Sequence, residues 1–166
     1  MTFFPALLLA AVLGRNEVLV CAVVREAERQ GLDPVVVCAL VEVESGWNPK
    51  ARNIGGDHGL FQVSRRWHGS HESVDDNIRT GCSILRKCIR DGSGSVAKGL
   101  ARYNAGRETT RGKAYARKVL TLAARIKKAV MGRKYHTVHY PCRVAQKDRV
   151  YGFQFEWAPK RRVRVR

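Results

Sequence analysis

Two glutamates stand at the end of an apolar segment, and one of them is placed to act as a proton donor. The stretch VVVCALVEVESGWNP, residues 35–49, runs through seven uncharged residues before Glu42 and Glu44, and it breaks at Gly46 and Pro49. A carboxyl group packed beside apolar side chains has its charged form disfavoured, which raises its pKa. On a helix Glu42 and Glu44 are about 200° apart, so the helix can present only one of them to a cleft.

Further motifs follow these glutamates in a definite order. Glu44-Ser45 is followed by Gly59-Leu60-Phe61-Gln62-Val63, by Gly81, by Tyr103-Asn104-Ala105-Gly106 and by Tyr115. This order resembles the lysozyme-like domain shared by soluble lytic transglycosylases and goose-type lysozymes, whose pattern is Glu-Ser, then Gly-Leu-Met-Gln, then Ala-Tyr-Asn-Ala-Gly. The resemblance covers about residues 16–130, and it is specific because several separate motifs recur in the right order.

The resemblance implies an enzyme that cleaves the bond between N-acetylmuramic acid and N-acetylglucosamine in peptidoglycan, without a cofactor. It matches Glu44, and not Glu42, to the position of the catalytic acid, which then also acts as the base. The implied substrate-binding set is Gln62 and Asn104 on the acetamido and hydroxyl groups, Tyr103 with its hydroxyl orienting Glu44, Ser45 steadying the loop at the helix end, and Tyr115 as the later helix tyrosine. Phe61 replaces the common Met of its motif as an apolar lining residue.

The second carboxylate that most glycosidases use is hard to find in this sequence. Goose-type lysozymes usually carry an aspartate where this chain has Ser64. Asp57 is the remaining loop candidate, although an Asx turn with Gly55 and Gly56 explains it better. In transglycosylase chemistry no second carboxylate is required, because the acetamido group of the substrate assists and its C6 hydroxyl attacks the anomeric carbon, leaving a 1,6-anhydro end. The alternatives are a goose-type muramidase that hydrolyses the same bond, and a non-catalytic basic protein that binds cell wall or nucleic acid.

Two histidine pairs superficially suggest a metal site. His68 and His71 are three residues apart, as are His136 and His139, and Cys142 follows the second pair. The first pair falls in a Gly-Ser loop and the second lacks a Cys-x-x-Cys companion, so the ligand pattern is incomplete. We therefore expect no metal.

Helical periodicity and capping residues predict the elements that must position these groups. By this pattern the body should be mainly α, with a short basic C-terminal extension, and the resemblance implies that the body is lysozyme-like. The expected elements are a helix over 16–30, a second helix that starts at Asp33-Pro34 and carries the glutamates, a loop over 46–57, a helix from Ser73 to Asp91, a short helix after Ser95, and a helix over 112–131.

Composition divides the chain into three parts. Residues 1–14 form an apolar run that is too short to span a bilayer and is either an export signal or a first core helix. Residues 15–131 contain the motifs of the resemblance, which implies that they form the lysozyme-like domain. Residues 132–166 hold ten Lys or Arg against two acidic residues, interleaved with aromatic side chains in a pattern that fits short strands or an ordered arm.

The charge of the chain points to a polyanionic partner. Lys and Arg total 31 against 14 Asp and Glu, a net charge of +17. With the resemblance, we expect glycan strands of peptidoglycan as the substrate and anionic wall polymers as ligands of the 132–166 tail. A recognised nucleic-acid reader motif is absent, so no dedicated nucleic acid partner is expected. We expect a monomer that acts in the cell envelope, in the periplasm or outside the cell.

The five cysteines cannot all pair within one chain. Cys82 and Cys88 are six residues apart on a predicted helix, a rise of about 9 Å, which is beyond disulfide reach. Cys21, Cys38 and Cys82 are best interpreted as small buried residues.

Overall fold

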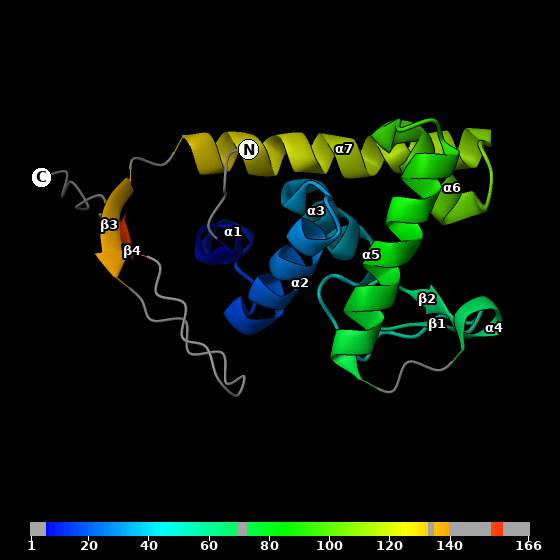
Figure 1. Cartoon of the computed structure of the whole chain (residues 1–166), viewed down its shortest axis with the longest axis horizontal. Coiled ribbons are helices and arrows are strands. Elements are labelled where there is room, and N and C mark those ends of the chain that lie inside the picture. The colour runs from blue at the N-terminus through cyan, green and yellow to red at the C-terminus, as the bar shows by residue number, and fades with distance from the viewer. Residues whose placement is uncertain (1–5, 70–72, 133–134, 140–153, 158–166) are drawn as a thin grey trace, which may run out of the picture. The chain divides into compact units, whose positions relative to one another are not determined.

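The computed structural model of the protein describes residues 6–69, 73–132, 135–139 and 154–157. Most of these residues belong to helices. In chain order these helices are α1 (Ala6–Leu13), α2 (Glu17–Arg29), α3 (Pro34–Ser45), α4 (Arg65–His68), α5 (Val74–Asp91), α6 (Val96–Ala105) and α7 (Thr110–Met131) (Figure 1). The chain divides into two units, residues 1–130 and 131–166. The prediction of a mainly α body is confirmed.

Helices α3, α5 and α6 begin at the capping residues that the sequence indicated. The side chains of Asp33, Ser73 and Ser95 accept hydrogen bonds from backbone amides at the starts of α3, α5 and α6. Gly46 ends α3 in the left-handed conformation, with a φ of 57°, which glycine adopts without steric cost. Helix α7 starts two residues earlier than expected, because the Thr109 hydroxyl accepts a hydrogen bond from the amide of Gly112.

One hydrophobic core joins helices α1, α2, α3, α5, α6 and α7 of the first unit. Helix α2 contacts α1, α3 and α5, and α5 also contacts α6. Leu9 of α1 is fully buried in this core, so the helix occupies the position expected of a first core helix, while removal of residues 1–14 during export stays a prediction. Among the described residues, no helix has both the length and the apolar character needed to cross a bilayer.

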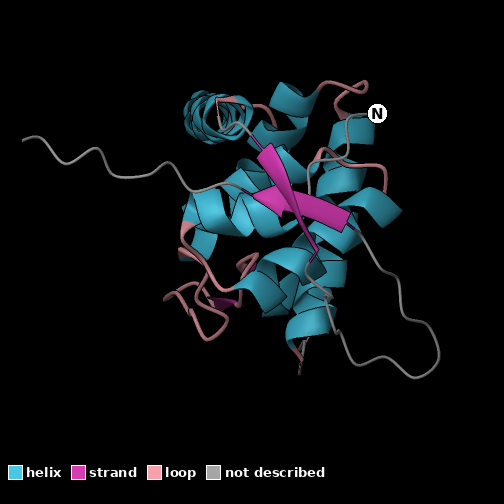
Figure 2. Ribbon diagram, turned by 90° about the vertical axis from the view of Figure 1, so that its left-hand side faces the viewer, coloured by secondary structure: helices cyan, strands magenta, loops and turns pink. Residues whose placement is uncertain are grey.

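A short strand pair, not predicted from the sequence, interrupts the helical body. β1 (Asp57–His58) and β2 (Val63–Ser64) pair antiparallel, with Asp57 opposite Ser64 and His58 opposite Val63. Figure 2 shows the loops of this region gathered around the pair at one side of the helices. The expected 46–57 loop therefore ends in a strand, and the segment up to α4 forms a compact hairpin-like turn.

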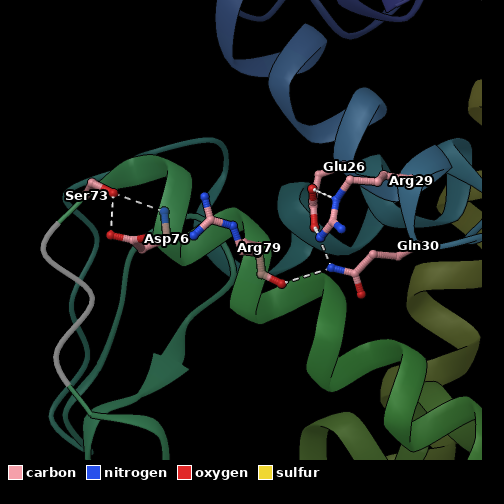
Figure 3. A network of polar contacts seen from close by, with 6 residues as sticks. All are labelled: Glu26, Arg29, Gln30, Ser73, Asp76 and Arg79. Carbon is pink, nitrogen blue, oxygen red and sulfur yellow. Dashed lines mark hydrogen bonds and ion pairs between the residues drawn. The ribbon is translucent and has the colours of Figure 1, made fainter.

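A polar network fixes the end of α2 against α5 (Figure 3). The side-chain amide of Gln30 donates hydrogen bonds to the Glu26 carboxylate and, at 3.1 Å, to the carbonyl oxygen of Arg79 on α5. Glu26 also accepts two hydrogen bonds from Arg29, which is the main reason that the pKa of Glu26 is lowered. Because Gln30 is buried, its amide would be costly to leave unpaired, and the bond to Arg79 keeps the two helices in register.

The cysteines of the first unit follow their predicted burial. Cys21, Cys38 and Cys82 are buried, and Cys88 is partly buried. Desolvation raises the pKa of the Cys82 thiol to about 12 and that of Cys38 further still. Cys142 lies outside the described residues.

In the second unit, the described residues include an antiparallel strand pair. β3 (Tyr135–His139) pairs with β4 (Gln154–Trp157), with Tyr135 opposite Trp157 and His139 opposite Gln154. These are the short strands that the aromatic and basic alternation indicated. The closing KRRVRVR segment lies outside the described residues.

Candidate active site

Glu44 lies partly buried in the last turn of α3 and is bonded to a helix far along the chain. The hydroxyl of Tyr115 on α7 donates a hydrogen bond to Glu44 Oε1. Burial is the main influence on this carboxyl and raises its pKa; the nearby charge of Asp57 adds to the rise, whereas the Tyr115 hydrogen bond and the Lys118 ammonium oppose it. The net direction is upward, so the carboxyl keeps its proton to a higher pH than an ordinary glutamate does. This is the environment that the apolar run before Glu44 led us to expect.

Glu42 is engaged on a different side of α3. Its carboxylate accepts two hydrogen bonds from the Arg15 guanidinium, from Nη2 at 2.6 Å and from Nε at 3.1 Å. Arg15 belongs to the connection between α1 and α2. The helix thus turns Glu44 toward α7 and Glu42 toward that connection, as their separation of about 200° predicts.

The loop that follows α3 folds back onto the end of this helix. The Ser45 hydroxyl lies 2.9 Å from the carbonyl oxygen of Leu60 and 3.2 Å from that of Val41, so it can tie the loop to the helix end by donating to Leu60. Its role in substrate binding stays a prediction. Gln62 adopts a φ of 46°, and its side-chain amide donates to the carbonyl oxygens of Gly59 at 3.0 Å and Ala51 at 3.2 Å. Both amide hydrogens of Gln62 are used within the loop, so a hydrogen bond from a sugar N–H to Gln62 would be accepted by Oε1.

Asn77 on α5 clamps the same loop, and our reading of the sequence did not single it out. Its Nδ2 donates to the carbonyl oxygen of His58 at 2.9 Å, and its Oδ1 accepts from the amide of Phe61 at 3.0 Å. Gly59 passes so closely that a Cβ there would lie 2.5 Å from the Asn77 side chain. The sequence signal that could have identified Asn77 is its position next to Ile78 on the apolar face of the predicted helix. A buried side-chain amide needs hydrogen-bond partners, so such a residue is expected to bind a neighbouring segment.

Removing the Asn77 side chain should loosen this loop. We expect Asn77→Ala to lower the free energy of unfolding by about 2–6 kcal/mol, because two buried backbone groups lose their partners at about 1–3 kcal/mol each. Urea unfolding measures the loss. Asn104→Ala, at an exposed position, is the matched control and should stay within about 0.5 kcal/mol of wild type. Equal midpoints for Asn77→Ala and wild type would show that the clamp contributes nothing.

Phe61 is a core residue, so the expectation that it lines the cleft is wrong. Its side chain is 0% exposed. The ring lies against α5, where a Cβ at Gly81 would come within 2.2 Å of the Phe61 Cγ atom. The Gly81 that belongs to the motif pattern is thus required by the close approach of this ring.

The structure corrects the expected partner of Tyr103. The Tyr103 hydroxyl donates to the carbonyl oxygen of Phe61 at 2.7 Å, and a phenol has only one hydrogen to donate. The hydrogen bond to Glu44 comes instead from Tyr115, because α7 passes the end of α3 while Tyr103 on α6 faces the loop. Tyr103 is nevertheless close enough for the charge of Glu44 to add to the burial that raises the Tyr103 pKa. Asn104 is exposed at the end of α6, and its sugar-binding role stays a prediction.

Asp57 is held within its loop and also lies near the site. Its Oδ2 accepts from Asn53 Nδ2 at 2.7 Å, and its amide donates to Asn53 Oδ1 at 2.9 Å. The side chain that closes the turn is therefore Asn53. Across the strand pair, Asp57 is directly opposite Ser64, the position that goose-type lysozymes usually fill with aspartate. A carboxylate thus stands beside that position, although the sequence motif lacks one.

The histidines bear on the expected absence of a metal. His68 is exposed in α4, and His136 and His139 belong to β3, whereas His71 and Cys142 lie outside the described residues. Across 6–69, 73–132 and the two C-terminal strands, no group of three or more His, Cys, Asp or Glu is placed to hold a metal ion.

Comparisons with known proteins identify the family and the fold of the chain. The family profile described as "Transglycosylase SLT domain" matches residues 22–120, a segment that contains Glu44, Gln62, Tyr103 and Tyr115. Among solved structures, an inactive mutant of the lytic transglycosylase Slt from Pseudomonas aeruginosa superposes with a TM-score of 0.57 and 22% sequence identity. The match covers 69% of this chain and 24% of that chain, so this chain spans about a quarter of the Slt structure. The predicted lysozyme-like helical fold is confirmed.

Proposed function

Because the chain belongs to the transglycosylase SLT domain family, whose enzymes act on the cell wall, we propose that it is a peptidoglycan lytic transglycosylase. It cleaves the β-1,4 bond between N-acetylmuramic acid and N-acetylglucosamine and leaves 1,6-anhydro ends. The observation that carries this proposal is the Glu44 carboxyl, whose pKa is raised by burial and whose Oε1 accepts a hydrogen bond from Tyr115. A raised pKa and a fixed orientation are both features that a general acid needs.

In the first step Glu44 delivers its proton to the glycosidic oxygen. Since Tyr115 donates to Oε1, the transferable proton resides on Oε2. As the bond from the anomeric carbon to the leaving oxygen breaks, the acetamido oxygen of the muramyl sugar bonds to that carbon. The Glu44 carboxylate left behind is stabilised by the Tyr115 hydrogen bond and by the Lys118 ammonium, both of which favour its charged form.

In the second step the same carboxylate acts as the base. It takes the proton of the C6 hydroxyl, whose oxygen bonds to the anomeric carbon and displaces the acetamido oxygen. Glu44 regains its proton, and water is not consumed. Gln62 and Asn104 hold the acetamido and hydroxyl groups, while Ser45 and Tyr103 act through the loop by bonding the carbonyl oxygens of Leu60 and Phe61.

Tyr115→Phe and Tyr103→Phe form a matched pair that separates the two tyrosines. The Tyr115 hydrogen bond lowers the pKa of Glu44, so its removal should raise that pKa and move the alkaline limb of kcat/KM to higher pH. The rate should also fall about tenfold or more, because a hydrogen bond to a charged group is lost. Tyr103→Phe should leave the limb in place and lower the free energy of unfolding by about 1 kcal/mol. Identical shifts of the limb in both variants would contradict the assignment of Tyr115.

Product analysis on purified peptidoglycan tests the reaction itself. Lytic transglycosylation predicts soluble muropeptides with anhydro ends, one water lighter than reducing ends, and no incorporation of heavy oxygen from labelled water. A goose-type muramidase would give labelled reducing ends. The observation that favours this alternative is Asp57 opposite Ser64; Asp57→Asn would then abolish cleavage, whereas transglycosylation should tolerate the change. Labelled reducing ends from wild type would overturn the proposed reaction.

We also propose where the protein acts. The cell envelope, either the periplasm or the outside of the cell, is the location that fits a wall substrate, with export through residues 1–14 and with the basic 132–166 tail adhering to anionic wall polymers. A monomer suffices for this site, since Glu44, Gln62 and Tyr115 belong to one chain. N-terminal sequencing of the exported protein shows whether residues 1–14 are removed.

A further inference from the structure

Helix α7 carries a dense positive charge on its exposed surface. It contains seven basic residues and no acidic one. All seven are exposed, and within the described part of the chain none of the ion pairs involves them. The seven are Arg111, Lys113, Arg117, Lys118, Arg125, Lys127 and Lys128.

Three of these cations line up beside the candidate site. Arg111, Lys118 and Arg125 are spaced seven residues apart, so successive members lie about 10 Å apart along α7 and drift only about 20° around it. Tyr115, which bonds Glu44, is four residues after Arg111 and three before Lys118, the spacings that place residues on one helix face. We call Arg111, Lys118 and Arg125 the cationic stripe.

One member of the stripe, Lys118, acts electrostatically on the Glu44 carboxyl. The Lys118 ammonium lowers the pKa of Glu44, which places its charge close to that group. Lys113 and Arg117 lie about 160° around the helix from Tyr115 and face away from it. The charge of α7 is therefore divided into a part beside the site and a part remote from it.

We propose that the cationic stripe binds the carboxylates of the peptide stems on the muramyl residues, so that peptide-bearing glycan strands are preferred over denuded strands. The inference rests on the proposed function. The sugars of the strand bonded near Glu44 are neutral, and the anionic groups nearest the scissile bond are carboxylates of the peptide attached to the muramyl lactyl group. Arginine guanidinium pairs with a carboxylate through two parallel hydrogen bonds, and a lysine ammonium supports it as a point charge.

Rates on three forms of one wall preparation test this preference. The wall is first freed of phosphate-containing polymers; one portion keeps its stems, one is denuded with an amidase, and one has its stem carboxylates converted to amides. Wild type should show a kcat/KM about threefold to tenfold higher on the first form than on either other form, as expected for a few solvent-exposed charge contacts. The readout is the ratio of kcat/KM on the stem-bearing form to kcat/KM on the denuded or the amidated form. A change in the pKa of Glu44 affects all three forms alike and therefore leaves this ratio unchanged.

Two double variants with the same loss of charge separate the stripe from general attraction. Arg111→Gln with Lys118→Gln should bring the ratio close to one. Lys113→Gln with Arg117→Gln, on the remote side of α7, should keep the wild-type ratio. Equal loss in both variants would overturn the inference in favour of a net-charge effect, and a ratio of one in wild type would overturn it directly.

Three outcomes identify what has failed. If wild type cleaves all three forms equally and yields anhydro ends, the stripe proposal is wrong while the proposed function stands. If restoring the phosphate-containing polymers, and not the stems, produces the preference, those polymers are the ligands and the stem assignment is overturned. If none of the forms is cleaved, the proposed function falls, and the inference falls with it.

Discussion

Replacing Glu44 by Gln should lower the rate of glycan cleavage by about 10²–10⁴-fold, the range for loss of a general acid or base, with the upper end expected because Glu44 serves in both roles. Glutamine has nearly the same shape, and its amide oxygen can still accept from Tyr115, but it has no proton to transfer at neutral pH. Release of soluble muropeptides measures the loss, and circular dichroism checks that the fold is retained.

Glu42→Gln is the control, because it changes the same side chain two residues earlier in α3. It removes the ion pair between Glu42 and Arg15, whose side chains are 25% and 38% exposed. The free energy of unfolding should therefore fall by less than about 1 kcal/mol. Activity should stay near wild type. Full activity in Glu44→Gln would remove Glu44 as the proton donor, and an unchanged biological effect would support the alternative of a non-catalytic wall-binding or nucleic-acid-binding protein.

The same variant should change how stability depends on pH. The folded-state pKa of Glu44 is raised, so between its unfolded value of about 4.3 and the folded value the native protein binds more protons than the unfolded chain. Glu44 therefore makes the free energy of unfolding fall as pH rises through that window. Glu44→Gln has no carboxyl group that titrates here, so it does not lose stability in this way. The Tm of the variant minus the Tm of wild type should therefore increase as pH rises through the window and then level off. A constant difference in Tm from pH 4 to pH 8 would contradict the raised pKa.

Gly81→Ala should lower the free energy of unfolding by about 1–3 kcal/mol, the range for overpacking a core. The added Cβ would lie 2.2 Å from Cγ and 2.3 Å from Cδ1 of Phe61, so the ring must move. Phe61 belongs to the loop that Ser45 and Asn77 hold, and its displacement should also reduce cleavage. Urea unfolding measures the first effect, with the exposed Ser83→Ala on the same helix as a control that should change little.

A double variant tests whether the ring is the cause. Phe61→Leu combined with Gly81→Ala leaves space for the new methyl group. The double variant should therefore lose less free energy of unfolding than the sum of the losses in the two single variants. Strict additivity would mean that the cost of Gly81→Ala arises elsewhere, for example in the backbone of α5.

The sequence predicted the elements well where local chemistry determines them. Short local motifs predicted where two helices begin: Asp33 with Pro34 for α3, and Ser73 with Asp76 for α5. Both starts are confirmed. The choice of Glu44 over Glu42 also rests on local geometry, since the turn of a helix alone separates their faces. The short β1–β2 pair escaped prediction because strands of two residues are too short to show an alternating pattern.

The parts that were not predicted depend on contacts between distant residues. Tyr103 and Tyr115 both lie near Glu44, and only the packing of α6 and α7 decides which hydroxyl reaches it. Phe61 looks like a cleft residue from its motif, but its burial depends on Gly81, twenty residues later. Asn77 belongs to no motif. Its structural role depends on hydrogen bonds to the Phe61 amide and the His58 carbonyl oxygen, which come within reach only in the folded chain.

Two core thiols are chemically silent for as long as the fold persists. The thiolate is the form that reacts with oxidants and disulfides, and burial raises the pKa of Cys82 to about 12 and that of Cys38 higher, so almost no thiolate forms near neutrality. Attack on either sulfur requires local opening of the packing around α3 and α5. Transfer from a reducing to an oxidising compartment therefore leaves these two side chains unmodified, and the redox state of the surroundings does not alter the helix that carries Glu44.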